Sequence, residues 1–467
     1  MSTLAVKAPL SSQAPTATKG NRIDWIERAW FLSVAVYAAA LPLWFFAPTG
    51  LAIGNWKSVL IVDALFAASV LLGLLRMALS RQWRLKPAVL IDALWLMLAI
   101  VLPVICSPDP RAGLPDIFRF GYSAVLYVMV AHLRLDANRL RLLAWLWAGA
   151  AVIITCRSLQ ALAIYQISDV RSPLLSFLGG AAYQGNLAVR LQGTFANPNT
   201  FAPFLNTALV FALILTREYK NRSFAWFLTI ASAAIIFAGG LLTSSRGTAG
   251  LILTLGLVAV WWSAASRWRG LMRIVSIAAM TCSVLAVLIT SIWWIYPVKR
   301  VSNTDNRVQL QINTDHAPYY LYHAGALRMF RAHPLTGIGP GRFEGQFRNY
   351  VSWEEVLPSF RWFAETEEGV RGRYASGSDP HSTWFGWLAR GGLMTMACLL
   401  IFAARAGGRI AKRPDAVAQA ALAGLVGVAF AGLYVEILHM RFIWLMLAVA
   451  TAWVTTQRAD TRLGGNA

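Results

Sequence analysis

LSVAVYAAALPLWFFA at 32–47 and IWLMLAVATAWV at 443–454 decide the fold, since neither stretch contains a charged residue. Of the 467 residues, 57% are hydrophobic and only 13% are charged, which is about half the charged fraction of a soluble domain. Apolar segments of about 20 residues are typical of helices that cross a bilayer, where each backbone polar group must be bonded internally. The sequence therefore predicts an all-α, polytopic membrane helix bundle.

Similar apolar segments follow one another along the chain, and we predict about 12 transmembrane helices. The expected spans are 29–46, 56–79, 87–106, 114–133, 140–166, 198–216, 223–243, 248–265, 272–297, 382–403, 416–434 and 437–456. Residues 1–28 are rich in Ser, Thr, Ala and Pro and lack the apolar core of a signal peptide, which predicts a disordered cytoplasmic tail. Residues 29–457 then form one membrane-embedded domain, and 458–467 form a cytoplasmic C-terminal tail.

The orientation follows from the Lys and Arg residues of the short connections. With the N-terminus in the cytoplasm, every second connection is cytoplasmic, and these connections are rich in basic residues, whereas the opposite set of short connections is poor in them. They include Arg76, Arg81, Lys86, Arg134, Arg139, Arg217, Lys220, Arg267, Arg405 and Lys412. Two long segments, about 167–197 and about 298–380, then lie outside. Long loops usually carry function, and the aromatic and basic residues of the second predict a packed cap.

Composition also excludes several classes of function. The net charge is +21, but the charges form short clusters between apolar runs and no nucleic-acid-binding motif accompanies them, so nucleic-acid binding is not expected. The cysteines form no CxxC pair and predict neither a zinc site nor a disulfide framework; they are Cys106, Cys156, Cys282 and Cys398. GIGPG at 337–341 lacks the lysine and serine of a P-loop. We therefore expect no metal and no cofactor.

Two arginines on the predicted outer side are candidates for anion binding. Arg190 precedes the sixth span in VRLQGTFANPNT, and Arg246 lies between the seventh and eighth spans in LLTSSRGTAGL. A planar guanidinium suits bidentate contact with phosphate oxygens, and the neighbouring Gly193 and Gly247 would let a ligand approach the backbone. The alternative is that these side chains reach lipid headgroups or cap helix ends.

Other polar residues gather near the same face. His381 opens the tenth span, where it could take a proton from a hydroxyl or be an ordinary interfacial histidine. Arg328 lies in a short amphipathic helix of the large loop. Glu436 lies at the outer junction of the last two spans with His439 and Arg441, where charges are costly unless paired or functional. The charged residues expected to pair inside the bundle are Asp63, Asp92, Arg119 and Arg157.

Four motifs, in this order over about 185–455, resemble signatures of the O-antigen ligase and O-antigen polymerase superfamily. The first is an arginine followed by Asn-Pro-Asn at the start of a span, and the second is Thr-x-Ser-Arg-Gly. The third is His-Pro-Leu-x-Gly-x-Gly-x-Gly, and the fourth is His-Ser followed at fixed spacing by Gly and Thr. They correspond to Arg190 with 197–199, to 243–247, to 333–341, and to His381 with Ser382, Gly392 and Thr395.

This resemblance implies a metal-independent glycosyltransferase, most similar to an O-antigen ligase, in the bacterial inner membrane. The active site would be periplasmic, 298–380 would be a periplasmic loop, and membrane lipids would surround the bundle. The donor would be a glycan on undecaprenyl diphosphate, and the acceptor a sugar hydroxyl of lipid A–core. His381 and Arg246 would be catalytic, whereas Arg190 and Glu436 would bind substrate.

One position departs from the family pattern. Many relatives carry an arginine in the large loop at a place that lies near Tyr319 in this chain, where the nearest arginine upstream is Arg307. The resemblance leaves Arg307 and Arg328 as alternative substrate-binding candidates for its role.

Three other functions stay open at this point: a polymerase that joins lipid-linked repeat units, a protein O-oligosaccharyltransferase, and a polysaccharide flippase or transporter. The transporter alternative predicts internal repeats and paired broken helices around a midplane site, and the sequence shows no such pattern.

Overall fold

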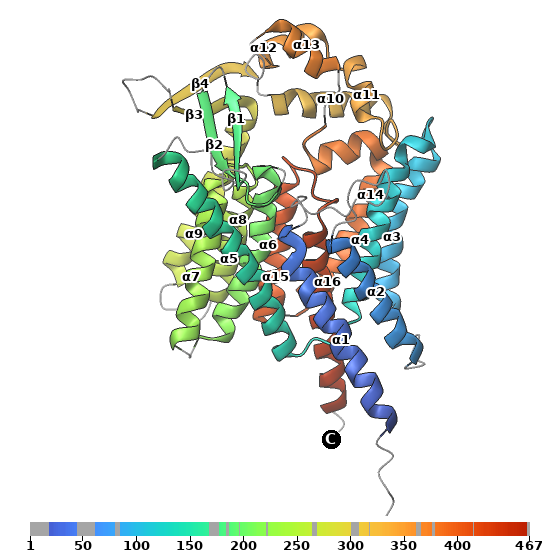
Figure 1. The fold of residues 1–467 in the computed structure, drawn as a ribbon. Coiled ribbons are helices and arrows are strands. Elements are labelled where there is room, and N and C mark those ends of the chain that lie inside the picture. Colours follow the sequence, from blue (N-terminus) through green and yellow to red (C-terminus); the bar gives the residue numbers. More distant parts are fainter. Residues whose placement is uncertain are drawn as a thin grey trace, which may run out of the picture.

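The computed structural model describes residues 18–43, 61–79, 85–167, 177–183, 186–195, 197–220, 223–263, 269–299, 308–316, 318–360, 366–375, 379–413 and 415–464. A helix occupies each segment predicted to span the membrane, and these helices form one bundle (Figure 1). They are α1 (Thr18–Ala40), α2 (Ile61–Leu79), α3 (Pro87–Ile105), α4 (Leu114–Ala131), α5 (Ala137–Ile167), α6 (Pro198–Glu218), α7 (Ser223–Leu242), α8 (Thr248–Trp262), α9 (Arg269–Ile292), α14 (Thr383–Ala411), α15 (Ala416–Ala431) and α16 (Arg441–Gly464).

The helices of the bundle differ in how far they are buried. In the part of the chain that the structure describes, eight helices are long and apolar enough to cross a membrane, and α8 and α15 are shorter apolar helices. Helix α6 is central, because 83% of the residues in its most apolar stretch are buried inside the protein. The corresponding fractions for α7 and α9 are only 22% and 11%. Apolar faces exposed on this scale suit lipid rather than water. The chain is a multi-pass helical membrane protein.

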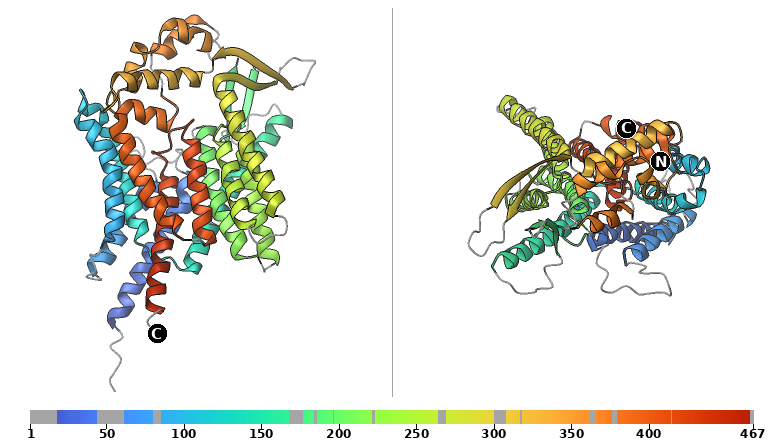
Figure 2. Two further views of the ribbon diagram at one scale, coloured as in Figure 1. Left: turned by 180° about the vertical axis from the view of Figure 1, so that it is seen from behind. Right: turned by 90° about the horizontal axis from the view of Figure 1, so that it is seen from above.

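Basic residues that the sequence assigns to the cytoplasm meet at one end of the bundle. The start of α1 and the end of α16 lie at this end (Figures 1 and 2). There Glu27 of α1 pairs with Arg76 of α2 at 3.2 Å and with Arg139 of α5 at 2.9 Å. The ammonium group of Lys86 donates to the hydroxyl of Thr455 at 2.7 Å. This arrangement agrees with an N-terminus and a C-terminus on the same side of the membrane.

A cap built from the two long connections covers the opposite end (Figure 1). It contains two antiparallel hairpins, β1 (Leu178–Tyr183) with β2 (Asn186–Leu191) and β3 (Trp293–Lys299) with β4 (Val308–His316). Four helices follow: α10 (Pro318–Ala332), α11 (Phe343–Gln346), α12 (Trp353–Phe360) and α13 (Glu367–Ala375). An apolar core that includes Leu321, Met329, Phe347 and Val356 joins them. The described part of 298–380 is thus a packed cap, as predicted.

Three predicted boundaries need correction. The ninth span was expected to reach residue 297, but α9 ends at Ile292. The aromatic and β-branched residues that follow it favour a strand, so the all-α expectation holds for the bundle but not for the hairpins of the cap. Residues 18–28, expected in the disordered tail, form the start of α1, which the ion pairs of Glu27 hold to the bundle. Helix α16 continues to Gly464, beyond the predicted end of the last span.

Most of the charged residues within the spans are paired. The pairs are Asp92 with Arg405 and Arg409, Asp63 with Arg441, and Arg119 with Asp116. Arg157 is the exception, because it is exposed and donates to Gln160 of its own helix at 3.0 Å. The prediction of interior pairing is wrong for Arg157, since its position on α5 turns away from the neighbouring helices.

Candidate active site

The first two motifs bind each other at the cap end of the bundle. From β2, Arg190 donates through Nε to the carbonyl oxygen of Thr243 at 2.8 Å and through a terminal nitrogen to Oδ1 of Asn199 at 3.0 Å. The same Oδ1 accepts a hydrogen bond from the hydroxyl of Ser245 at 2.9 Å. One amide oxygen, that of Asn199, therefore joins β2, the start of α6 and the α7–α8 turn.

Two helices begin beside this junction. Asn197 caps α6, with its Oδ1 accepting from the backbone N–H of Thr200 at 3.0 Å, and Pro198 occupies the first helical position, where no amide hydrogen is needed. Helix α8 begins at Thr248, two residues after Arg246. The N-termini of helices carry partial positive charge. Together with the arginines, they give this corner a positive potential that can hold an anion.

The guanidinium group of Arg246 lies between aromatic rings. Its central carbon is 4.2 Å from the ring centroid of Tyr319 and 6.0 Å from that of Tyr434. One terminal nitrogen donates to the carbonyl oxygen of Thr290, and Nε is buried without a hydrogen-bond partner among the described residues. A buried donor without a partner costs about 1–3 kcal/mol, so a ligand oxygen at this position would stabilise the arrangement.

His381 contacts the same tyrosine ring. The centroid of its imidazole is 5.7 Å from that of Tyr319 and 5.2 Å from that of Tyr322. Burial lowers the pKa of His381 below its usual 6.5, although the carboxylate of Asp379 opposes this shift. A histidine with a lowered pKa is neutral near pH 7 and can accept a proton. His381 and Arg246 thus place a base and a cation around Tyr319.

Backbone strain marks the same two motifs. Among the described residues, the non-glycine positions with positive φ are Ser244, at 47°, and His381, at 46°. This left-handed region is uncommon for residues with a side chain, and such positions concentrate at functional sites. Ser244 lies in the second motif, two residues before Arg246, and His381 opens the fourth.

A second histidine lies close by. His323 of α10 stacks on Phe385 of α14, with centroids 4.5 Å apart and an angle of 18° between the ring planes. Burial lowers the pKa of His323 to about 4, and the nearby Arg246 and His381 add to this shift. His323 is therefore a second neutral imidazole beside the site, and its Nε2 is buried without a hydrogen-bond partner among the described residues.

Three elements fix the position of His381. Ser382 caps α14, with its Oγ accepting from the backbone N–H of Phe385 at 3.3 Å and donating to the carbonyl oxygen of Gly432 at 3.2 Å. The hydroxyl of Thr383 accepts from the backbone N–H of Ile437 at 2.7 Å. The start of α14 is therefore bonded to the α15–α16 connection, while α10 contacts His381 from the cap.

The third and fourth motifs form another junction. The turn at 333–341 lies against a kink in α14, where the backbone N–H of Ile338 donates to the carbonyl oxygen of Ala389 at 2.9 Å. Gly392 at the kink has a φ of 60°, and a Cβ there would lie 2.5 Å from the carbonyl oxygen of Leu335. Only glycine fits this position without strain. The glycine-rich turn at 333–341 therefore docks onto α14.

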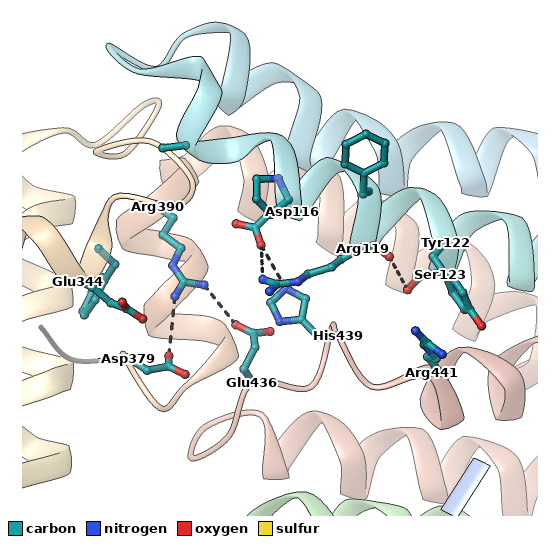
Figure 3. Close-up of a pocket in the computed structure, with 15 residues that line it drawn as sticks. Asp116, Arg119, Tyr122, Ser123, Glu344, Asp379, Arg390, Glu436, His439 and Arg441 are labelled. Carbon is teal, nitrogen blue, oxygen red and sulfur yellow. Dashed lines mark hydrogen bonds and ion pairs between the residues drawn. The ribbon is translucent and has the colours of Figure 1, made fainter. Parts of the chain in front are cut away.

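A cavity of about 800 Å³ lies beside this junction (Figure 3). It is lined by the start of α4, the turn before α11, the first part of α14 and the α15–α16 connection. Its titratable residues are Asp116, Arg119, Tyr122, Glu344, Asp379, Arg390, Glu436, His439 and Arg441. Asp379 connects this cavity with His381, because its carboxylate accepts from the backbone N–H of His381 at 3.3 Å. The size is typical of a small-ligand site.

The structure brings together three of the predicted site residues. Arg246 and His381 both contact Tyr319. Arg190 is linked to the same ring through Asn199, whose Nδ2 lies 3.4 Å from the Tyr319 hydroxyl. Residues from β2, the α7–α8 turn, α10 and the start of α14 thus meet at one place.

The other predicted residues lie elsewhere. Arg328 is in the cap, where both terminal nitrogens donate to the carboxylate of Glu355, at 2.9 and 2.6 Å. These bonds hold the pKa of Glu355 at about 2, so the pair stays ionised and tethers α10 to α12. Glu436 lines the cavity. Arg307 lies outside the described residues.

Several residues around the site escaped the sequence analysis. Tyr319 was considered only as a missing arginine, and nothing singled out Tyr434 or Asp379 as part of a site. Arg390 had a detectable signal, since it is the only charged residue in the predicted span 382–403. A charge inside an apolar span is a functional candidate by default.

The described residues contain no group of three or more His, Cys, Asp or Glu side chains that could hold a metal ion. Residues 231–400 match the family described as O-antigen ligase. The matched region runs from α7 to α14, includes Arg246 and His381, and confirms the resemblance based on the motifs. None of the curated proteins compared with this chain matches it.

Proposed function

Residues 231–400 belong to the O-antigen ligase family, and on this premise we propose a glycan transfer reaction. The protein transfers a polysaccharide from undecaprenyl diphosphate to a sugar hydroxyl of lipid A–core, on the periplasmic face of the bacterial inner membrane. The observation that carries the proposal is the position of the Tyr319 ring. Its centroid lies 4.2 Å from the guanidinium carbon of Arg246 and 5.7 Å from the centroid of the His381 imidazole. The transfer uses a cation for the leaving diphosphate and a base for the acceptor hydroxyl, and both of these side chains contact this ring.

The donor diphosphate binds at the corner formed by the first two motifs. The unpartnered Nε of Arg246 would donate to a ligand oxygen, and the N-termini of α6 and α8 add partial positive charge to the corner. Arg190 is already held by Asn199 and Thr243, so it supplies charge and shapes the corner. These groups bind the negative charge that grows on the leaving diphosphate, a contribution of about 3–4 kcal/mol for one well-placed donor.

The acceptor hydroxyl reacts next to His381. Its oxygen forms a bond to C1 of the donor sugar, the bond between C1 and the diphosphate oxygen breaks, and undecaprenyl diphosphate leaves. The proton of the hydroxyl passes to the neutral imidazole of His381. A general base of this kind contributes about a hundred- to ten-thousandfold in rate. The reaction is metal-independent in this proposal, because arginine and helix N-termini supply the positive charge.

Two further residues from the sequence analysis take different roles. We keep Arg328 out of the diphosphate site, since both of its terminal nitrogens are engaged by Glu355. We assign Glu436 to the acceptor side, because it lines the cavity next to His381. Arg307 remains a candidate for contact with the donor.

A polymerase and a protein glycosyltransferase would use the same donor site, so the acceptor decides between them. The decisive experiment supplies purified protein in vesicles with a lipid-linked polysaccharide and three acceptors: lipid A–core, a second lipid-linked repeat unit and a pilin-like protein. Transfer to lipid A–core supports the ligase. Longer lipid-linked chains indicate a polymerase, and a glycosylated protein indicates the third activity. Movement of donor across the vesicle without any transfer would replace the proposal with the transporter.

A further inference from the structure

The cavity beside His381 contains an arginine held loosely between two carboxylates. A terminal nitrogen of Arg390 lies 3.7 Å from Oδ1 of Asp379, and the other lies 3.7 Å from Oε2 of Glu436 (Figure 3). Charge-assisted hydrogen bonds between such groups are normally about 2.7–2.9 Å long. Neither pair forms a full hydrogen bond at this distance, so a hydroxyl group beside each pair can donate to the carboxylate and accept from the guanidinium.

A second ion pair faces the first across the cavity. Asp116 of α4 lies 3.0 Å from Arg119 and 3.6 Å from Nε2 of His439 (Figure 3). Burial lowers the pKa of His439 to about 3, so its ring is neutral. The remaining cation, Arg441, pairs with Asp63 of α2. Every arginine of the lining therefore has a carboxylate beside it, which gives the cavity little attraction for an anion.

Polar atoms of this lining lack partners. Nε of Arg390, Oε2 of Glu436 and Nε2 of His439 are buried without a hydrogen-bond partner among the described residues. Buried polar groups are nearly always hydrogen-bonded, and an exception calls for a ligand, a water or a functional reason. Burial also raises the pKa of Glu436 to about 7, so near neutral pH this carboxyl group can either donate or accept.

We propose that this cavity binds a neutral saccharide, the terminal sugars of the acceptor, through hydroxyl groups that bridge Arg390 to its carboxylates. This inference rests on the proposed function and adds the place of the acceptor. Sugars offer many hydroxyls that both donate and accept, and they carry apolar faces. The cavity matches both properties, since Phe118, Tyr122 and Phe343 line it together with the charged groups.

The position of the cavity fits an acceptor rather than the donor. Asp379 contributes to the lining and also accepts from the backbone N–H of His381. Arg246 contacts His381's neighbour Tyr319 and is absent from the lining. His381 is therefore linked to the diphosphate corner through Tyr319 and to the cavity through Asp379. An acceptor sugar held by Glu436 and Arg390 would bring a hydroxyl towards the imidazole from the side away from the arginine that binds the leaving group.

Direct binding tests this inference without requiring catalysis. The probes are a delipidated, dephosphorylated core oligosaccharide and inorganic pyrophosphate, each titrated into the purified full-length protein in detergent. The variants are Asp379→Asn and Glu436→Gln, which keep the shape of the two side chains beside Arg390 and remove their charge. The matched controls are Glu354→Gln and Glu367→Gln on the cap surface. Unchanged melting temperatures show that a variant is folded.

We expect each cavity variant to weaken oligosaccharide binding by about tenfold, the loss of one hydrogen bond to a charged group, and to leave pyrophosphate binding unchanged. Arg246→Ala should do the reverse, and the controls should change neither. In transfer assays, the cavity variants should raise KM for lipid A–core but not for the lipid-linked donor. Cavity variants that weaken pyrophosphate binding, or that leave oligosaccharide binding intact, overturn the inference. A wild-type protein that binds the oligosaccharide but transfers nothing refutes the proposed function alone.

Discussion

The guanidinium carbon of Arg246 lies 4.2 Å from the ring centroid of Tyr319, so a cation–π contact sets the direction in which this arginine reaches. A contact of this kind contributes about 0.5–2 kcal/mol, more when it is shielded from water. Tyr319 comes from α10 in the cap, whereas Arg246 comes from the α7–α8 turn of the bundle. The cap therefore takes part in building the diphosphate corner.

Replacing Arg246 with Ala should lower transfer by about a hundred- to a thousandfold, the effect of removing one donor from a developing anion. Arg246→Lys should recover only part of the loss, because an ammonium group cannot make a planar bidentate contact. The measurement is the initial rate of transfer by purified protein. Arg157→Ala is the matched control, since Arg157 is exposed on α5 and bonds only within its own helix in the described structure. Normal transfer by Arg246→Ala would remove this residue from the site.

Asn199→Ala should separate the first two motifs. Its Oδ1 accepts from both Arg190 and Ser245, and the loss leaves these partly buried donors without that acceptor, at a cost of about 1–3 kcal/mol. We expect a lower melting temperature together with weaker binding of pyrophosphate. Asn349→Ala, which removes an exposed amide bonded to Gln346 in the cap, should change neither. An unaltered Asn199→Ala protein would mean that the two motifs are held together by other contacts.

Much of this organisation could be predicted from the sequence, and the reasons for the rest are physical. The spans depend on local hydropathy, so α3 and α6 were located to within a residue of their starts. The pairing of Arg190 with Asn199 depends on β2, a short strand in a connection that carries no span signal. Tyr319 and Asp379 acquire their roles only through tertiary contacts with Arg246 and His381. The spacing of residues in the sequence does not predict such tertiary contacts.

Gly392→Ala should damage the junction of the third and fourth motifs. The φ of 60° and the carbonyl oxygen of Leu335, 2.5 Å from an added Cβ, make the substitution strained by about 1–3 kcal/mol. The melting temperature of the detergent-solubilised protein should fall accordingly. Gly407→Ala in the same helix has open space around the new methyl group and should be neutral or slightly stabilising. Equal melting temperatures for the two variants would contradict the packing of the 333–341 turn against the kink at Gly392.

Cysteine labelling tests the orientation of the bundle. Ser352 lies exposed in the cap, and Lys220 lies exposed at the α6–α7 connection. In a background where the native cysteines are replaced, a membrane-impermeant thiol reagent added to the periplasmic side should label Ser352→Cys but not Lys220→Cys. Detergent permeabilisation should make both reactive. The reverse pattern would invert the topology and place the site in the cytoplasm.

The pH dependence of transfer should report the neutral form of His381. Its pKa is lowered by burial, so the base remains competent down to pH values below 6.5, and the rate falls only as pH drops through this lowered pKa. Asp379 is the charged group that opposes the shift. The titratable groups nearby include His323 and Arg246, the second of which contacts Tyr319. Asp379→Asn should therefore move the acidic side of the pH–rate profile to still lower pH. A wild-type rate that already falls at or above pH 6.5 would contradict a buried base.

His381→Ala should lose most of the transfer while keeping the binding of pyrophosphate, because diphosphate recognition is assigned to Arg246 and its neighbours. A general base contributes about a hundred- to ten-thousandfold, which sets the expected loss in kcat. His381→Gln should be equally poor if the imidazole takes the proton, and much better if the ring only positions the acceptor through a hydrogen bond.

The structural alternative for His381 makes a different prediction. In this alternative His381, with its φ of 46° and its place before the cap residue Ser382, only anchors the start of α14. In that case His381→Gly, which relieves the left-handed strain, should restore both stability and transfer relative to His381→Ala. For a base, His381→Gly should restore the melting temperature alone and leave transfer as low as in His381→Ala. Recovery of transfer in the glycine variant would end the catalytic assignment, because no proton acceptor would remain at this position.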